Sequence, residues 1–388
     1  MKEEILCKLH RHFSKNIQKV LAQVSFLMNG YDSFYYRTPI KGTDKFRKPK
    51  SHNIGLPYPI PFEEYYGNKE LDFLAFADWG EQKPESGQFQ VAKALQARAN
   101  EKTLFIVNAG DNFYQKDNKL PYNDKIDHEG VLSINDPKWH KYWLNVYNGT
   151  LKEIFWYMVA GNHDWYTNVT AQVDYFWEKD IRFFFPSLYY SRRVHFGRNN
   201  DILAVFIHID TNPFYYKYDA YSSKDGMKRN LLALKLHDKE QLDNRLKWIE
   251  DQLITAQDAD WIFVVGHHPL VGACQTEHPS SYLMHKFPPL FEKYNVSAYI
   301  GGHVHDIELS EANSTSSVTY FGVGGGGATG DDTCGDATWS APFTFGFLHI
   351  NIPHGNILHF NYIEANETDK PSHIVHSGIV HSRKCHEK

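Results

Sequence analysis

Cysteine is scarce in this 388-residue sequence, which contains only Cys7, Cys274, Cys334 and Cys385. Four widely spaced cysteines are too few for a disulfide scaffold, and none forms the Cys-x-x-Cys pair of a structural zinc site. One disulfide is compatible with this number, and the sequence does not choose its partners. At 45.1 kDa, the chain is long enough to bury a full core, as one large domain or two smaller ones.

Long hydrophobic runs are also absent. No stretch of about eighteen apolar residues occurs, so no transmembrane helix is expected. The net charge of −5 and the isoelectric point near 6.5 argue against a nucleic-acid partner. The apolar run at 20–28 follows basic residues but is interrupted by Gln23 and Ser25, which makes it a poor signal-peptide core.

Five Asn-x-Ser/Thr sequons favour a glycoprotein of the secretory route. We therefore expect a secreted, lysosomal or vacuolar location despite the absence of a clear signal peptide. The sequons are Asn148, Asn168, Asn295, Asn313 and Asn366.

Three parts can be distinguished along the chain. Residues 1–68 are rich in Pro, Gly and Lys towards their end and are typical of an N-terminal extension or linker. Residues 69–366 carry the regular patterns of a catalytic domain. Residues 367–388 are predicted to form a polar, solvated C-terminal tail.

Strands and helices alternate within the central part, which predicts an α/β fold with a parallel or mixed sheet covered by helices. In such sheets, ligands bind beyond the carboxyl ends of the strands. Strands are predicted within 71–80, 103–114, 154–166, 201–211, 260–269 and 296–306, helices within 86–100, 168–180 and 238–257, and further strands within 317–327, 343–352 and 356–365.

Polar side chains follow five of these predicted strands. One Asp at a strand end usually caps a turn, and one His among 22 is usually a surface or core residue. Two His separated by one residue are more informative, because alternate strand residues share a face. Five such motifs next to glycine indicate one site. Its candidate residues are Asp78, Asp111, Tyr114, Asn162, His163, His267, His303 and His305.

The chemistry of these side chains suggests metals. Carboxylate, amide, imidazole and phenol groups are oxygen and nitrogen donors, and no thiolate is among them. Leaving His163 aside, the donors are too many for one tetrahedral site. They suit two metals about 3.5–4 Å apart that share a carboxylate, the arrangement used for in-line attack on phosphorus.

The motifs "DWG", "GDNFY", "GNHD", "VVGH" and "GHVH" resemble those of the purple acid phosphatases, within the calcineurin-like metallophosphoesterases. The small, mammalian-type tartrate-resistant enzymes are the most similar group, from about Leu71 to Ala365. The resemblance implies an α/β sandwich of mixed sheets flanked by helices, with a dinuclear site at the strand ends.

The resemblance also implies a role for each ligand. Tyr114 would bind Fe(III) as a phenolate, Asp111 would bridge the metals, and Asp78 and His305 would complete the iron shell. The divalent metal (Fe, Zn or Mn) would be held by Asn162, His267 and His303. Many other two-metal phosphoesterases have Asp-x-His at the first motif. Gly80 stands there instead, so Tyr114 supplies the missing ligand.

The implied activity is that of an acid phosphatase, in which a metal-activated hydroxide attacks a phosphomonoester. The substrate could be a small molecule or a phosphoprotein. His163 would hydrogen-bond the phosphate, and His278 would be a second outer histidine. The distance from His267 to His278 is two residues longer than the small enzymes lead us to expect.

Two other functions are compatible with the sequence. One is a different two-metal phosphoesterase, a phosphodiesterase or protein phosphatase, against which Gly80 and Tyr114 argue. The other is a catalytically silent scaffold, which the loss of ligands would mark. The segment 115–139 is longer than its family counterpart and is predicted to lie near the mouth of the site; 215–238 corresponds to a regulatory loop by analogy alone. The physiological substrate, the divalent metal and the oligomeric state are not determined by the sequence.

Overall fold

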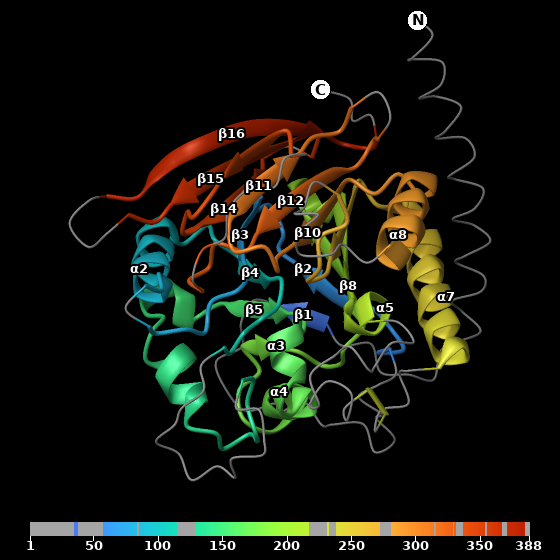
Figure 1. Ribbon diagram of the computed structural model, residues 1–388. Coiled ribbons are helices and arrows are strands. Elements are labelled where there is room, and N and C mark those ends of the chain that lie inside the picture. Colours follow the sequence, from blue (N-terminus) through green and yellow to red (C-terminus); the bar gives the residue numbers. More distant parts are fainter. Residues whose placement is uncertain are drawn as a thin grey trace, which may run out of the picture.

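Two β-sheets form the centre of the computed structural model (Figure 1). The structure describes residues 35–37, 57–83, 85–114, 129–216, 231–232, 238–271, 281–313, 316–328, 330, 337–353, 355–366 and 371–384. The nine-stranded sheet has the order β1-β2-β7-β8-β9-β10-β12-β11-β13. Its strands are β1 Tyr35–Arg37, β2 Phe62–Tyr65, β7 Tyr190–Phe196, β8 Ile202–His208, β9 Trp261–Val265, β10 Ala298–Gly301, β11 Ile307–Ser310, β12 Thr319–Val323 and β13 Trp339–Ala341.

The seven-stranded sheet has the order β16-β15-β14-β3-β4-β5-β6. Its strands are β3 Leu71–Phe76, β4 Phe105–Asn108, β5 Phe155–Met158, β6 Phe183–Phe184, β14 Gly346–Ile352, β15 Ile357–Glu364 and β16 His373–His381. Strands β3 to β6 are parallel to one another, whereas β14, β15 and β16 pair antiparallel. The predicted α/β fold with mixed sheets is therefore confirmed.

Helices lie outside the two sheets. Helix α2 lies beside the seven-stranded sheet, and α7 and α8 lie together on the opposite side (Figure 1). The helices are α2 Gln88–Arg98, α3 Asn162–Trp165, α4 Val169–Glu178, α5 Asn212–Tyr216, α7 Lys239–Thr255 and α8 Ser281–Lys293, with shorter turns η2 Trp139–Leu144, η3 Gly149–Lys152, η4 Arg198–Asn200 and η5 Ala256–Asp258. Among the described helices, none combines the length and the hydrophobicity needed to cross a bilayer.

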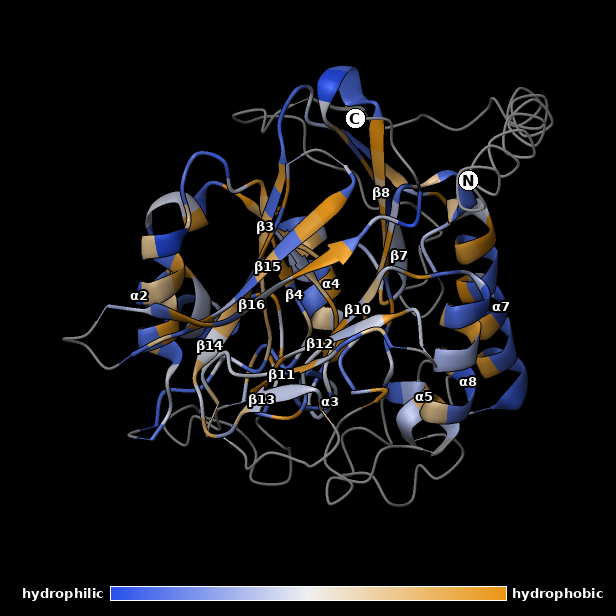
Figure 2. Cartoon of the chain, turned by 90° about the horizontal axis from the view of Figure 1, so that it is seen from above, coloured by the Kyte–Doolittle hydropathy of each residue, from blue (hydrophilic) through white to orange (hydrophobic). Residues whose placement is uncertain are grey.

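Aromatic side chains join the inner faces of the sheets. The ring of Phe73 on β3 lies 5.5 Å from that of Phe206 on β8 and 5.9 Å from that of Phe263 on β9, in edge-to-face contacts. Phe105 on β4 makes a similar contact with Phe206, at 5.6 Å. Strands covered on both faces are expected to be hydrophobic along their whole length. Figure 2 shows such continuous hydrophobic colouring on β8, beside the mixed colouring of α2 and α7.

Part of the N-terminal segment, predicted to be an extension or linker, belongs to the larger sheet. Strand β2 pairs in parallel with β7 and carries Glu64 inwards, where both carboxylate oxygens accept hydrogen bonds from Arg192, at 2.7 and 2.9 Å. The Arg192 guanidinium lies over the ring of Tyr157, 3.0 Å from its centroid. The two adjacent glutamates of β2 obscured this strand in the sequence, because only the ion pair makes one of them a core residue.

The C-terminal segment also differs from its prediction as a polar tail. Residues 373–381 form β16, which pairs antiparallel with β15 at the edge of the smaller sheet. Val375 and Val380 pack against the core, while Ile374 and Ile379 are each 50% exposed. The strand is hard to recognise from sequence because histidine, serine and glycine separate its apolar residues.

Strand β2 allows a test of the buried ion pair against a surface pair one residue away. Glu64→Gln should lower the free energy of unfolding by about 3–5 kcal/mol, because it leaves the Arg192 charge buried without its partner. Glu63 contacts Arg193 and His195, and its side chain is 32% exposed. Glu63→Gln should therefore cost about 1 kcal/mol or less. Urea unfolding at pH 7 measures both, and equal losses would contradict the assignment.

Candidate active site

Each sequence-predicted donor follows a strand, and the strands come from both sheets. Asp78, Asp111 and Asn162 follow β3, β4 and β5, which are adjacent in the smaller sheet. His267 follows β9, and His303 and His305 follow its neighbour β10 in the larger sheet. Since neighbouring parallel strands end at the same edge, each sheet brings its own donors together.

Hydrogen bonds from backbone amides connect the loops that carry the donors, both between the two sheets and within each sheet. The amide of His303, from the larger sheet, donates to Asp78 Oδ2 of the smaller one at 2.9 Å. Within the larger sheet, the Gly302 amide donates to the His267 carbonyl at 2.8 Å. Within the smaller sheet, the His163 amide donates to Asp111 Oδ1 at 2.8 Å. The carboxylates are thus oriented by the main chain of the loops that carry the other donors.

Three of the donors have a strained backbone. Asp78, Asp111 and His303 have φ values of 61°, 50° and 75°, in the left-handed region that costs a residue with a side chain about 1–2 kcal/mol. The neighbouring glycines have a steric role. A Cβ on Gly161 would lie 2.0 Å from Asp111 Oδ1, and a Cβ on Gly302 would lie 2.3 Å from Asp78 Oδ2. The motif glycines therefore make room for carboxylates in tight turns.

One group of donors surrounds the Tyr114 hydroxyl. Its oxygen lies 2.5 Å from Asp78 Oδ1, 3.0 Å from Asp111 Oδ2 and 2.9 Å from His305 Nε2. A phenol has one hydrogen and can donate to only one of these atoms. Two carboxylates and a phenol oxygen so close together form a hard, anionic oxygen cluster, and this donor set fits a cation.

A second group surrounds the Asn162 amide oxygen. This oxygen lies 3.1 Å from His267 Nε2 and 3.0 Å from His303 Nδ1. His267 Nδ1 donates to the Ala109 carbonyl at 2.9 Å, which leaves Nε2 facing the Asn162 oxygen. Imidazole nitrogens beside an amide oxygen are donors that fit a cation, and the hydrogen bond from Nδ1 is the usual support of a metal-binding imidazole.

Asp111 is common to both groups. Its Oδ2 lies 3.0 Å from the Tyr114 oxygen and 3.3 Å from His267 Nε2. Donor atoms of Asp111, His267 and His303 lie within 4.8 Å of one another, close enough to hold one metal ion. The structure therefore brings all seven predicted donors into two adjoining groups with one shared carboxylate.

The pKa values of the cluster are shifted because its ionisable groups are buried close together. Burial raises the pKa of Asp78 to about 6, although His267 and His305 oppose the rise. Burial also raises the pKa of Tyr114 well above its usual value, and the Asp111 and Asp78 carboxylates add to the rise. Burial would lower the pKa of His267, but Asp111 and Asp78 raise it to about 9. The anionic groups thus favour positive charge beside them.

The predicted outer histidines have different outcomes. His163 lies beside the cluster with its Nε2 3.8 Å from Asp111 Oδ2, and its side chain is 22% exposed, so it can reach a molecule in solvent. His278 lies outside the described residues, as does most of the 215–238 segment. The 115–139 segment is described from Glu129 onwards, and Glu129 lies against His163.

Sequence reasoning missed a buried network that supports the site. Asp164 accepts hydrogen bonds from the amide of Gly161 at 2.9 Å, the amide of Asn112 at 3.0 Å and the side chain of Gln172 at 2.7 Å. It joins the loop that carries Asp111 to the one that carries Asn162. The available signal was the final Asp of "GNHD" together with the Asn of "GDNFY".

A second missed residue is Thr211, which follows strand β8. Its Oγ1 lies 2.7 Å from His268 Nδ1 and accepts a hydrogen bond from the His268 amide at 3.2 Å. Next to it, the Asn212 side chain donates to the Ala160 carbonyl at 3.1 Å. The polar Asp-Thr-Asn run after an apolar strand was the only sequence signal for this support.

Comparison with known proteins defines the class of the molecule. Residues 71–306 match the model of the calcineurin-like phosphoesterases, which is more than half of the chain. The chain therefore belongs to the calcineurin-like phosphoesterase family.

Within that family, the relatives bear out the resemblance to the purple acid phosphatases. The chain is 30% identical over 262 residues to the tartrate-resistant acid phosphatase type 5 of Mus musculus, covering 66% of this chain and 72% of the relative. It is 29% identical over 267 residues to purple acid phosphatase 7 of Arabidopsis thaliana, covering 66% and 70%.

The chain is also similar to a solved structure, and at this level of identity the similarity concerns the fold alone. The solved structure is that of GAP50, the anchor in the inner membrane complex of Plasmodium, with a TM-score of 0.64 and 23% identity over 82% of this chain and 90% of that chain.

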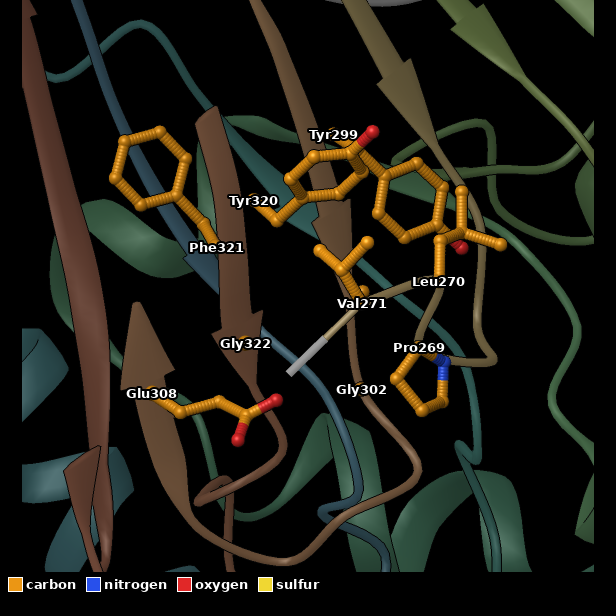
Figure 3. Close-up of a pocket in the computed structure, with 10 residues that line it drawn as sticks. Pro269, Leu270, Val271, Tyr299, Gly302, Glu308, Tyr320, Phe321 and Gly322 are labelled. Carbon is orange, nitrogen blue, oxygen red and sulfur yellow. The ribbon is translucent and has the colours of Figure 1, made fainter. Parts of the chain in front are cut away.

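A small pocket is lined by the residues that follow His268 and those that precede His303 in the sequence (Figure 3). Its lining includes Pro269, Tyr299 and Gly302, and the Glu308 carboxylate points into it (Figure 3). Glu308 is 6% exposed, and its Oε2 has no hydrogen-bond partner among the described residues. Burial raises the pKa of Glu308 to about 7. This carboxyl is therefore a cost to the folded state once it ionises.

Glu308 gives the folded protein a pH-dependent stability. Its pKa is about 7 in the folded state and near 4.5 ordinarily, so the folded state binds the proton more tightly. The free energy of unfolding should fall by about 3 kcal/mol between pH 4.5 and pH 7 through this group.

Glu308→Gln should remove that loss and raise stability most at pH 8, with little change at pH 4. Denaturant unfolding of both proteins at the two pH values measures the effect. The exposed Glu101→Gln is the control, and a gain that is the same at both pH values would contradict the assignment.

Proposed function

We propose that this protein is an acid phosphatase that hydrolyses phosphomonoesters with a ferric–divalent metal pair. The observation that carries the proposal is the convergence of all seven donors into two groups that share Asp111. The family and the acid phosphatase relatives support it. A structural carboxylate cluster would have no need of a phenol oxygen 2.5 Å from Asp78 and a histidine 2.9 Å from that phenol.

The donor chemistry favours one allocation of the metals. Asp78, Tyr114 and His305 would hold the ferric ion, because hard, anionic oxygens prefer a trivalent metal. Asn162, His267 and His303 would hold the divalent ion, Fe, Zn or Mn, and Asp111 would serve both. When bound, such a pair supplies Lewis-acid stabilisation and an activated water for attack on phosphorus.

The charges of the chain's own residues support a phosphate monoester as the substrate. Asp78, Asp111 and an ionised Tyr114 do not fully neutralise a ferric and a divalent ion. The remaining positive charge suits the dianion of a phosphate monoester better than the monoanion of a diester. His163 is the partly exposed imidazole at the edge of the cluster and would bind a phosphate oxygen. His278 remains proposed as the second outer histidine.

A silent scaffold is the alternative from another functional class. The structural likeness to GAP50 concerns the fold, and it carries no activity to this chain. Loss of donors from the cluster would favour a scaffold, and the chain retains all seven, each within hydrogen-bonding distance of at least one other. Folded protein that binds no metal would favour the scaffold directly.

Tyr114 provides the first test of the proposed metal pair. A phenolate bound to ferric iron absorbs visible light by charge transfer, so the purified protein should be violet or pink. Tyr114→Phe should lose the band. The matched control is Tyr166→Phe, which removes a nearby hydroxyl that accepts from Asn162 and should keep the colour. A visible spectrum with metal analysis measures this; two bound metals without iron would move the protein to another group of two-metal phosphoesterases.

Substrate class is tested with a matched pair of esters. Para-nitrophenyl phosphate should be hydrolysed with a kcat/KM at least tenfold above that of bis(para-nitrophenyl) phosphate at acidic pH. His267→Ala should lower the metal content by one ion per chain and kcat by about two orders of magnitude or more, because a proposed ligand of the divalent metal is lost. A faster diester reaction would support a phosphodiesterase instead.

A further inference from the structure

Glu129 lies within the segment 115–139, which is longer than its counterpart in the family, and backbone hydrogen bonds hold it in place. The amide of the next residue, Gly130, donates to the Phe113 carbonyl at 2.7 Å. The Gly130 carbonyl accepts from Lys138 Nζ at 2.6 Å, and the Glu129 carbonyl accepts from the Thr167 hydroxyl. These contacts hold the backbone without using the Glu129 carboxylate.

The carboxylate of Glu129 faces the imidazole of His163, which is proposed to bind phosphate. Its Oε2 lies 2.7 Å from His163 Nδ1, the distance of an ion pair, and its side chain is 13% exposed. The other ring nitrogen of His163, Nε2, faces Asp111 Oδ2 at 3.8 Å. The rings of Tyr114 and Tyr166 lie close to the imidazole, with centroids 4.2 and 5.0 Å away.

A ring held in this way has little freedom to turn. The tyrosines limit its tilt, but a half-turn about the Cβ–Cγ bond would exchange the two edges of the imidazole, and that torsion is intrinsically soft. Only a partner at one nitrogen distinguishes the two orientations. The Glu129 carboxylate, 2.7 Å from Nδ1, favours the orientation in which Nδ1 faces Glu129 and Nε2 faces the cluster, as outer-shell carboxylates do for other functional histidines.

We propose that Glu129 is a positioning residue, which holds the His163 imidazole with Nε2 towards the phosphate of the substrate. The inference rests on the proposed function and deepens it, because it assigns phosphate recognition in part to the loop that differs from the family pattern. Glu129 acts through His163 and does not itself contact the substrate.

The fold does not depend on the Glu129 carboxylate, because the buried network around Asp164 already holds these loops. Asp164 already joins Gly161, Asn112 and Gln172 by hydrogen bonds, and the Glu129 backbone is held independently. Removal of the carboxylate should therefore leave the fold, the metal content and the visible band unchanged, and affect only how His163 meets phosphate.

The test uses four metal-loaded proteins: wild type, Glu129→Ala, His163→Ala and the double variant. The KM for para-nitrophenyl phosphate and the inhibition constant of inorganic phosphate should each rise about five- to tenfold in Glu129→Ala, with kcat changed less than threefold. Glu129→Gln keeps an oxygen at the same place and should recover most of the loss. Glu101→Gln, a surface glutamate before β4, should match the wild type.

The double variant decides whether Glu129 works through His163. If it does, Glu129→Ala should add nothing to His163→Ala, because residues that act as one unit are not additive. Additive effects, or an unchanged KM and phosphate inhibition constant in Glu129→Ala, would overturn the inference while leaving the phosphatase proposal intact.

The same four proteins also distinguish failure of the proposed function from failure of the inference about Glu129. Absence of phosphomonoester hydrolysis in wild type would overturn that function alone. The coupling of the two residues can then be read from the urea midpoints of the same four proteins, which need neither activity nor phosphate. Independent midpoint shifts would show that Glu129 does not hold His163, and a shared shift would support the contact.

Discussion

The close approach of Asp78, Asp111 and the Tyr114 hydroxyl is the interaction around which the site is arranged. The phenol oxygen lies within 3.0 Å of both carboxylates, and all three side chains are buried. Burying several acidic groups together is costly unless positive charge accompanies them. Two features of the structure can offset this cost: the histidines beside the acidic groups and the arrangement of oxygens, which fits a cation. The positive φ angles of Asp78 and Asp111 and the glycines beside them follow from the need to bring these oxygens together.

That requirement also explains why two sheets are needed. The smaller sheet supplies the carboxylates, the phenol and the amide oxygen, and the larger sheet supplies the imidazoles of His267, His303 and His305. A packed aromatic core fixes the sheets relative to each other, and the His303 amide ties its loop to Asp78. A shift of one sheet against the other would separate the two donor classes. The packing of the core therefore also determines the geometry of the site.

The sequence revealed the centre of this arrangement and little of its surroundings. Strands β3, β4, β5, β9 and β10 were recognisable because each is a continuous apolar run that ends in a motif. The motifs are local, so their residues could be grouped without knowing the fold. Strand β2 was missed because Glu64 becomes a core residue only through Arg192, which lies 128 positions further along the chain. Strand β16 was missed because edge strands need few apolar residues. Contacts between distant segments leave no periodic trace in a sequence, which is also why Glu129 and Thr211 were not identified.

Asp164 and Glu129 show two ways in which a carboxylate can support the same loop. Asp164 belongs to a family motif, is fully buried, and accepts hydrogen bonds from the main chain and from Gln172, so it sets the position of the Asn162 backbone. Glu129 comes from a loop outside the motifs, is partly exposed, and contacts a side chain that itself reaches solvent. Under the proposed function, the first arrangement would support the metal-binding loops that the family shares. The second would act where substrate enters, and functional differences between proteins of one fold reside in such loops. The metal centre would therefore set the reaction, and the contact between Glu129 and His163 would set the affinity of this chain for phosphate.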